Sequence, residues 1–179
     1  MASKLVTSRS LAFVLMAAGL AVSGCGTTST TQSANKERPT MSSKNRIRLE
    51  HVALNVQDPV AMAKWYCENV GTKVVREGPA PANARFLSDA DGNMMLELYH
   101  NPPDAVPDYK SMDPLVLHIA FMVDDVQTLS RKLVAAGASV HQDVYKTDTG
   151  DQIVMLRDPW GVPIQFLTRA KPMLEFDDD

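Results

Sequence analysis

The chain contains nearly the same phrase twice, first as LEHVALNV and later as VLHIAFMV. In both copies a histidine stands in an apolar run, and an aspartate follows the run, Asp58 in the first copy and Asp125 in the second. An amphipathic segment comes next and stops at a glycine, Gly71 or Gly137, and three short strand-like runs complete each copy. The pattern predicts a duplicated β-α-β-β-β unit, because such glycines end helices and the alternating runs are typical of strands.

The duplication sets the expected domain organisation. We expect one domain over residues 46–170, a length typical of a single domain, with modules at 46–101 and 115–169. The linker between them, 102–114, is rich in proline, which excludes a regular helix or a central strand. An acidic tail, 171–179, follows the second module.

The N-terminal part predicts export. Residues 1–24 have a positively charged start, an apolar run too short to span a bilayer, and small residues at the end. The small residues before Cys25 resemble a bacterial lipobox, which implies lipidation of Cys25 and, since Gly26 follows it, anchoring at the periplasmic face of the outer membrane. The alternative is an ordinary cleaved signal with Cys25 incidental. Residues 25–45 are rich in serine and threonine and predict a flexible tether.

The charge and the cysteine content argue against a nucleic-acid-binding protein and against a disulfide framework. Loss of residues 1–24 removes Lys4 and Arg9 and changes the formal net charge from −3 to −5. With no basic stripe, we expect no nucleic-acid partner. The chain has two cysteines, so if Cys25 carries lipid, Cys67 has no partner for a disulfide.

Strand alternation predicts which side chains face the helices. It places His51 and His118 on the face away from the helices, together with Glu97 of MMLELY and Gln165 of PIQFL. A carboxylate in such an apolar strand is costly to bury unless a cation meets it. Two histidines and two oxygen donors can close on one divalent metal, and this thiolate-free set suits Zn, Ni, Co, Mn or Fe(II). The alternative is that backbone groups satisfy both histidines and a basic side chain pairs with Glu97.

These residues, with the helix end WYCENVG and the closing motif DPWGVPIQF, resemble the vicinal oxygen chelate superfamily of glyoxalases, extradiol dioxygenases and bleomycin-resistance proteins. The resemblance implies an α+β fold in which paired βαβββ modules form curved mixed sheets that cup a metal or ligand site, often within a homodimer. It places the metal ligands at His51, Glu97, His118 and Gln165. Whether the site closes within one chain or across a dimer is left open.

The chain departs from glyoxalase I at two places. Gln165 stands where that enzyme usually has a glutamate base, so Glu97 is the only carboxylate of the set and the candidate catalytic residue. Asn101 matches an asparagine that binds glutathione, but Asn55 stands where an arginine is expected, which removes a charged partner for the glutathione carboxylate. The residues expected to contact substrate are Asn55, Tyr99, Asn101 and Met122.

Three functions remain open. The first is a metal-dependent isomerase or lyase that acts on a small carbonyl or hydroxy-acid compound, with Glu97 moving the proton. The second is an extradiol-type Fe(II) dioxygenase with His51, His118 and Glu97 as its ligands. The third is a small-molecule-binding protein without catalysis. A need for metal separates the first two from the third, and oxygen consumption separates the second from the first.

Overall fold

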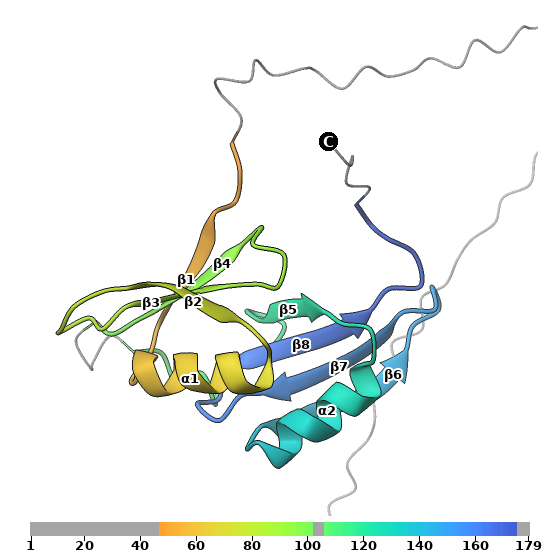
Figure 1. Cartoon of the computed structure of the whole chain (residues 1–179). Helices are drawn as coiled ribbons and strands as arrows, with labels where there is room; N and C mark the ends of the chain where they lie inside the picture. Colours follow the sequence, from red (N-terminus) through yellow and green to blue (C-terminus); the bar gives the residue numbers. More distant parts are fainter. Residues whose placement is uncertain (1–46, 102–105, 175–179) are drawn as a thin grey trace, which may run out of the picture. The chain divides into compact units, whose positions relative to one another are not determined.

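The computed structural model describes residues 47–101 and 106–174, and it confirms two successive β-α-β-β-β modules (Figure 1). The first module consists of β1 (His51–Asn55), α1 (Pro59–Asn69), β2 (Lys73–Glu77), β3 (Arg85–Ser88) and β4 (Met95–Tyr99). The second consists of β5 (Ile119–Met122), α2 (Val126–Ala135), β6 (Ser139–Lys146), β7 (Gln152–Arg157) and β8 (Pro163–Thr168).

Each module forms its own four-stranded mixed sheet, in the order β1-β4-β3-β2 and β5-β8-β7-β6. The first strand of each module runs parallel to the last, and the other neighbours are antiparallel. The expected fold class is therefore confirmed, with open sheets rather than closed barrels. The strands β1 and β5 lie at sheet edges, which leaves one side of each available for a neighbour.

The two aspartates that precede the amphipathic segments begin the helices, as the sequence indicates. The side chain of Asp58 accepts a hydrogen bond of 3.0 Å from the Ala61 N–H, and Asp125 accepts one of 2.9 Å from the Thr128 N–H. Such caps satisfy backbone donors that have no partner inside the helix. After each helix the chain turns at a glycine with positive φ, 94° at Gly71 and 100° in the second module.

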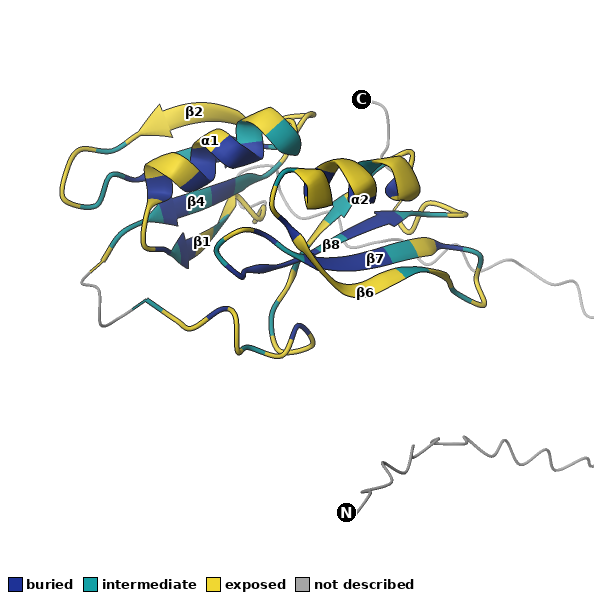
Figure 2. Cartoon of the chain, turned by 90° about the horizontal axis from the view of Figure 1, so that it is seen from below, coloured by how far each residue is buried: buried dark blue, intermediate teal, exposed yellow. Residues whose placement is uncertain are grey.

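Figure 2 colours each residue by how far it is buried, and burial alternates along β1 and β4 as the sequence predicts. Leu54, Leu96 and Leu98 are buried on the face that α1 covers, whereas His51 on the other face is exposed. In the second module Ile164 and Phe166 are fully buried and Gln165 between them is half-buried. The outer strands β2 and β6 are exposed along most of their length.

The beginning of β5 differs from the expected strand. Val116 lies in a turn, and the strand starts at Ile119, just after His118. Asp113 causes this, because its carboxylate accepts the Leu115 N–H at 2.9 Å and its carbonyl accepts the Val116 N–H at 2.9 Å. These bonds close a tight turn where the sequence pattern indicates a longer strand.

The helix-facing sides of both sheets contribute to one hydrophobic core. Its buried residues come from both modules, among them Tyr66 of α1, Leu133 of α2 and Phe166 of β8. Phe121 of β5 stacks on Phe166 with 5.3 Å between ring centroids and lies 6.4 Å from the ring of Tyr66. The faces that carry the predicted metal ligands are the opposite faces of the two sheets, so they point away from this common core.

A buried tyrosine and a buried aspartate connect the modules. The Tyr66 hydroxyl donates a hydrogen bond of 3.0 Å to Asp158 Oδ2, and Asp158 Oδ1 accepts the N–H groups of Trp160 and Val162 at 2.9 Å each. Burial raises the pKa of Asp158 from 3.8 to about 6, although these three donors oppose the shift. Burial, followed by the charge of Asp158, raises the pKa of Tyr66 well above its usual value.

This raised pKa predicts a pH dependence of stability. A carboxyl group with a higher pKa in the folded state stabilises the fold fully below its ordinary pKa of 3.8, and that contribution is lost as the pH rises through about 6. Relative to Asp158→Asn, the wild-type free energy of unfolding should fall by up to about 3 kcal/mol between pH 4 and pH 7. Urea unfolding of both proteins at several pH values measures the difference, and parallel pH profiles would refute it. Asp125 and Asp151, whose pKa values are lowered by hydrogen bonds, are present in both proteins.

Several expectations concern residues outside the described part of the chain. The predicted signal at residues 1–24, lipidation of Cys25 and the whole tether at residues 25–45 lie there, as do residues 175–179 of the acidic tail. Membrane attachment therefore stays a prediction. Within residues 47–101 and 106–174, no helix has the length and apolar character needed to cross a membrane.

Candidate metal centre

His51 and Glu97 form one half of the predicted metal site. Ala53 pairs with Glu97 across β1 and β4, and His51 lies two residues earlier on the same face. The His51 Nε2 atom lies 3.4 Å from Glu97 Oε2, and their side chains are 38% and 21% exposed. The small side chain of Ala53 leaves room above the sheet. The structure thus brings together an imidazole and a carboxylate on an accessible face.

Glu50 holds the other side of the His51 ring, a contact that sequence reasoning missed. The Glu50 carboxylate contacts His51 Nδ1. The hydrogen bond that His51 donates to the Glu50 carboxylate raises the pKa of His51 above 6.5, and burial opposes this shift. When a carboxylate accepts the Nδ1 proton, the Nε2 atom of a neutral imidazole is left as the metal-binding atom. Alternation places neighbouring side chains on opposite faces, but Glu50 lies just before β1 and is not held to that rule.

His118 and Gln165 form the corresponding half in the second module. Gln165 pairs with Ala120 as Glu97 pairs with Ala53, and His118 precedes Ala120 by two residues. The His118 Nδ1 atom lies 2.7 Å from the carbonyl oxygen of Pro114. As at His51, a partner at Nδ1 directs Nε2 to a ligand. Only the partner differs, a carboxylate in one module and a backbone carbonyl in the other.

The two halves do not meet within this chain. Among the described residues, no three histidine, cysteine, aspartate or glutamate side chains gather closely enough to hold a metal ion. His118 is therefore out of reach of the pair His51 and Glu97. The reason is the packing of the modules, whose helix-facing sides share one core and leave the two ligand pairs on outer faces of different sheets. The expected four-residue set stays a prediction that one chain alone does not satisfy.

The predicted substrate residues lie on or beside these outer faces. Asn55 Oδ1 accepts the Asn101 N–H at 2.8 Å, and the Asn55 carbonyl accepts the Tyr109 hydroxyl at 2.9 Å. Asn55 therefore fixes the end of β1 against the segment after β4. Tyr99 is half-buried at the end of β4, and Met122 in the second module is 73% exposed.

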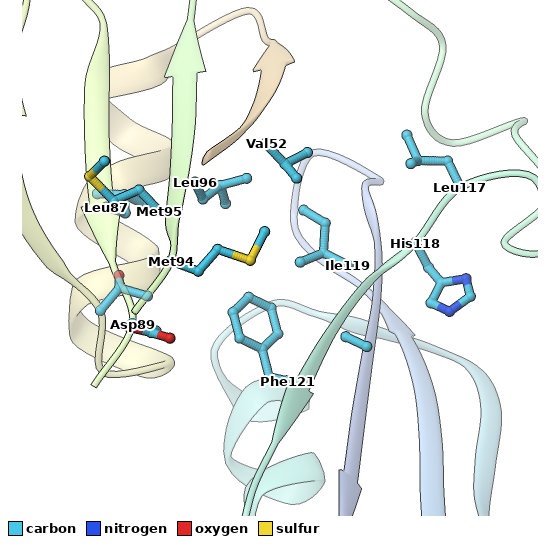
Figure 3. A pocket seen from close by; sticks show the side chains of 12 residues that line it. Val52, Leu87, Asp89, Met94, Met95, Leu96, Leu117, His118, Ile119 and Phe121 are labelled. Carbon is cyan, nitrogen blue, oxygen red and sulfur yellow. The ribbon is translucent and has the colours of Figure 1, made fainter. Parts of the chain in front are cut away.

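An apolar pocket of about 300 Å³ lies between the modules (Figure 3). Its walls include Val52 and Leu96 from the first module and Ile119 and Phe121 from the second. His118 belongs to its rim, but in Figure 3 its ring points away from Ile119 and Phe121. The pocket does not gather the predicted metal ligands.

The donor set itself fits a divalent metal. Each histidine has a partner at Nδ1 and presents Nε2, and each has an oxygen donor at the matching sheet position. Two imidazoles, one carboxylate and one amide oxygen make a mixed nitrogen and oxygen shell of the kind that Zn, Ni, Co, Mn and Fe(II) accept. The fit requires that one first-module face lies opposite one second-module face.

Comparison with known proteins supports the same fold. The structure is similar to a glyoxalase family protein from Bacillus cereus, with 16% identity, coverage of 73% of this chain and 100% of that one, and a TM-score of 0.63. It is also similar to TnmS3, an antibiotic binding protein from Streptomyces sp. CB03234, with 20% identity, coverage of 70% and 98%, and a TM-score of 0.56.

A further similar structure is a glyoxalase I mutant from Zea mays, with 26% identity and a TM-score of 0.56. The match covers 69% of this chain and 46% of that one. No match was found among curated protein sequences. The family model of the Glyoxalase/Bleomycin resistance protein/Dioxygenase superfamily matches residues 48–166, more than half of the chain. The chain therefore belongs to this superfamily.

Proposed function

We propose that the protein is a divalent-metal-dependent lyase or isomerase of the glyoxalase type, acting on a small carbonyl or hydroxy-acid compound at a site completed by two copies of the chain. The observation that carries the proposal is the pair His51 and Glu97, 3.4 Å apart on an accessible outer face, with its counterpart His118 and Gln165 on the second sheet. A bound divalent metal supplies Lewis-acid polarisation of a substrate oxygen.

Glu97 and Gln165 have different roles in the proposed reaction. Glu97 is the only carboxylate of the four predicted ligands and is the group that takes up and returns a substrate proton. Gln165 occupies the equivalent position but has an amide, which donates and accepts hydrogen bonds and does not take up a proton near neutral pH. The two half-sites thus have different roles, and proton transfer belongs to the first module.

Exposed apolar side chains support pairing between copies. Ile47 and Leu49, just before β1, are 94% and 66% exposed. Leu115 and Val116, just before β5, are 85% and 76% exposed. Both groups lie at strands that form the open edge of their sheet in the described part of the chain. Contiguous apolar surface at a free strand edge is typical of a protein interface. Placing β1 of one copy beside β5 of another would cover both groups and bring the two half-sites together.

Metal content tests the proposal. Wild-type residues 46–179, loaded with Zn, Ni, Co, Mn or Fe(II) and then desalted, should retain a near-stoichiometric amount of at least one metal by elemental mass spectrometry. His118→Ala should lose most of the metal, because removing a metal ligand reduces the affinity for the metal by orders of magnitude. His141→Ala is the matched control, since His141 lies exposed in β6 away from the ligand positions. Equal metal retention by His118→Ala and wild type would refute the proposal.

A further inference from the structure

A β-bulge changes which side chains of β2 face the predicted metal site. In the pairing of β2 with β3, Val74 is opposite Leu87 and Arg76 is opposite Phe86, which leaves Val75 as an extra residue. In a regular strand, Lys73 and Arg76 would point to opposite faces because they are three residues apart. The bulge inserts one residue and returns both to the same face.

That face is the one that carries His51 and Glu97. Phe86, the partner of Arg76, is itself paired with Glu97 across β3 and β4. Lys73 pairs with Ser88, and Ser88 pairs with Met95, the partner of His51. Lys73 therefore lies in the same row of the sheet as His51. The edge strand β2 therefore presents two cations on the metal-facing side of the first sheet.

Phe86 joins the cation to the metal half-site. The His51 ring meets the Phe86 ring edge to face with 5.9 Å between centroids. The Arg76 guanidinium carbon lies 5.9 Å from the centre of the same ring, a cation–π distance. An imidazole, an aromatic face and a guanidinium thus follow one another across the sheet.

The charge of Arg76 is not used elsewhere in the described part of the chain. No described carboxylate lies within salt-bridge distance of Arg76 or Lys73, and the neighbouring Glu77 pairs with Arg85 at 3.7 Å. Arginine is well suited to bind carboxylates because its planar group can donate two parallel hydrogen bonds. A free guanidinium beside an aromatic ring is therefore available to an anionic ligand.

The second module has the same bulge without the charge. Val140 pairs with Leu156 and Gln142 with Met155, so His141 is the extra residue of β6. The residue in the place of Arg76 is Gln142, and Ser139 stands in the place of Lys73. The bulge is thus common to both modules, whereas the cations distinguish the first.

We infer that Arg76, with Lys73 beside it, is an anion-binding subsite that selects substrates with a carboxylate remote from their metal-chelating group. The inference rests on the proposed function, because it places the chelating carbonyl or hydroxy-acid group at His51 and Glu97. Since β2 lies two strands from β4, the subsite is roughly 10 Å from Glu97 along the sheet. The substrate is then a compound whose apolar body lies on Phe86 and whose second anionic group reaches Arg76 on the edge strand β2.

The probe for this subsite is para-carboxymandelate. Its hydroxy-acid group matches the metal half-site, its aromatic ring matches Phe86, and its second carboxylate matches Arg76. Its binding to the metal-loaded protein is compared by calorimetry with that of mandelate and of para-carbamoylmandelate, in which a neutral amide replaces the second carboxylate. Wild type should bind para-carboxymandelate about tenfold more tightly than either analogue, the factor expected of one charge-assisted hydrogen bond. Arg76→Met should abolish this preference. Lys64→Met, which removes an exposed cation from α1, should keep it.

A second readout separates failure of the subsite from failure of the metal proposal. In metal-free protein, para-carboxymandelate should shift the NMR signals of the Arg76 side chain and the Phe86 ring, and the uncharged mandelamide should not. If no metal binds but these shifts occur, the subsite stands and the metal proposal fails. A preference equal in wild type and Arg76→Met, or lost equally in Lys64→Met, would overturn the inference.

Discussion

Replacing Asp158 with alanine is expected to destabilise the fold by about 3 to 5 kcal/mol at pH 5. The substitution leaves three donors without their acceptor, the Tyr66 hydroxyl and the N–H groups of Trp160 and Val162. Each buried donor that loses its partner costs about 1 to 3 kcal/mol, and partial hydration of the turn reduces the sum. The measurement is made below the Asp158 pKa of about 6, because above it the buried charge itself costs stability.

Tyr66→Phe is the matched control for this prediction. It removes only the hydrogen bond from Tyr66 to Asp158 and leaves the two backbone donors of the turn bonded to Asp158, so we expect a loss of about 1 kcal/mol. Urea unfolding of both variants and wild type gives the comparison. If Asp158→Ala costs no more than Tyr66→Phe, the aspartate does not hold the turn and the modules in the way described.

Much of the fold follows from local patterns. The aspartates that begin the helices, the glycines that end them and the alternation of apolar residues in β1, β4 and β8 are all local signals, and each corresponds to an element of the structure. The start of β5 is an exception, because side-chain and backbone bonds of Asp113 close a turn where apolar residues indicate a strand.

The packing of the modules against each other could not be predicted in the same way. It depends on contacts between distant positions, such as the hydrogen bond from Tyr66 to Asp158, which are 92 residues apart. Nothing in the DPWG segment itself shows that its aspartate is buried against Tyr66 of α1. Consequently the sequence predicts the face of each ligand residue and not which faces meet.

The candidate site, too, could be predicted from the sequence only in part. Alternation is sufficient to place His51, Glu97 and Gln165 on the faces opposite the helices, whereas His118 lies just before β5. It does not predict that Glu50 turns toward His51, because that residue lies outside the strand. It also does not predict that Arg76 joins the metal face, because a bulge at Val75 changes the register and no simple sequence signal marks it.

In the proposed function, a first-module face of one copy and a second-module face of another form one metal site. A heterodimer of two defective chains tests it directly. His51→Ala and His118→Ala, each with a different affinity tag, are co-expressed, and the mixed dimer is isolated by two successive affinity steps. In that dimer, the His118→Ala chain supplies an intact His51 and the His51→Ala chain supplies an intact His118.

We expect the heterodimer to retain one metal ion, whereas the wild-type dimer should retain two and each mutant homodimer almost none. One complete site forms from the two intact halves, and the second site lacks both histidines. If the heterodimer is as poor in metal as the two homodimers while the wild type is loaded, the site closes within a single chain and the proposed site shared between two copies is wrong.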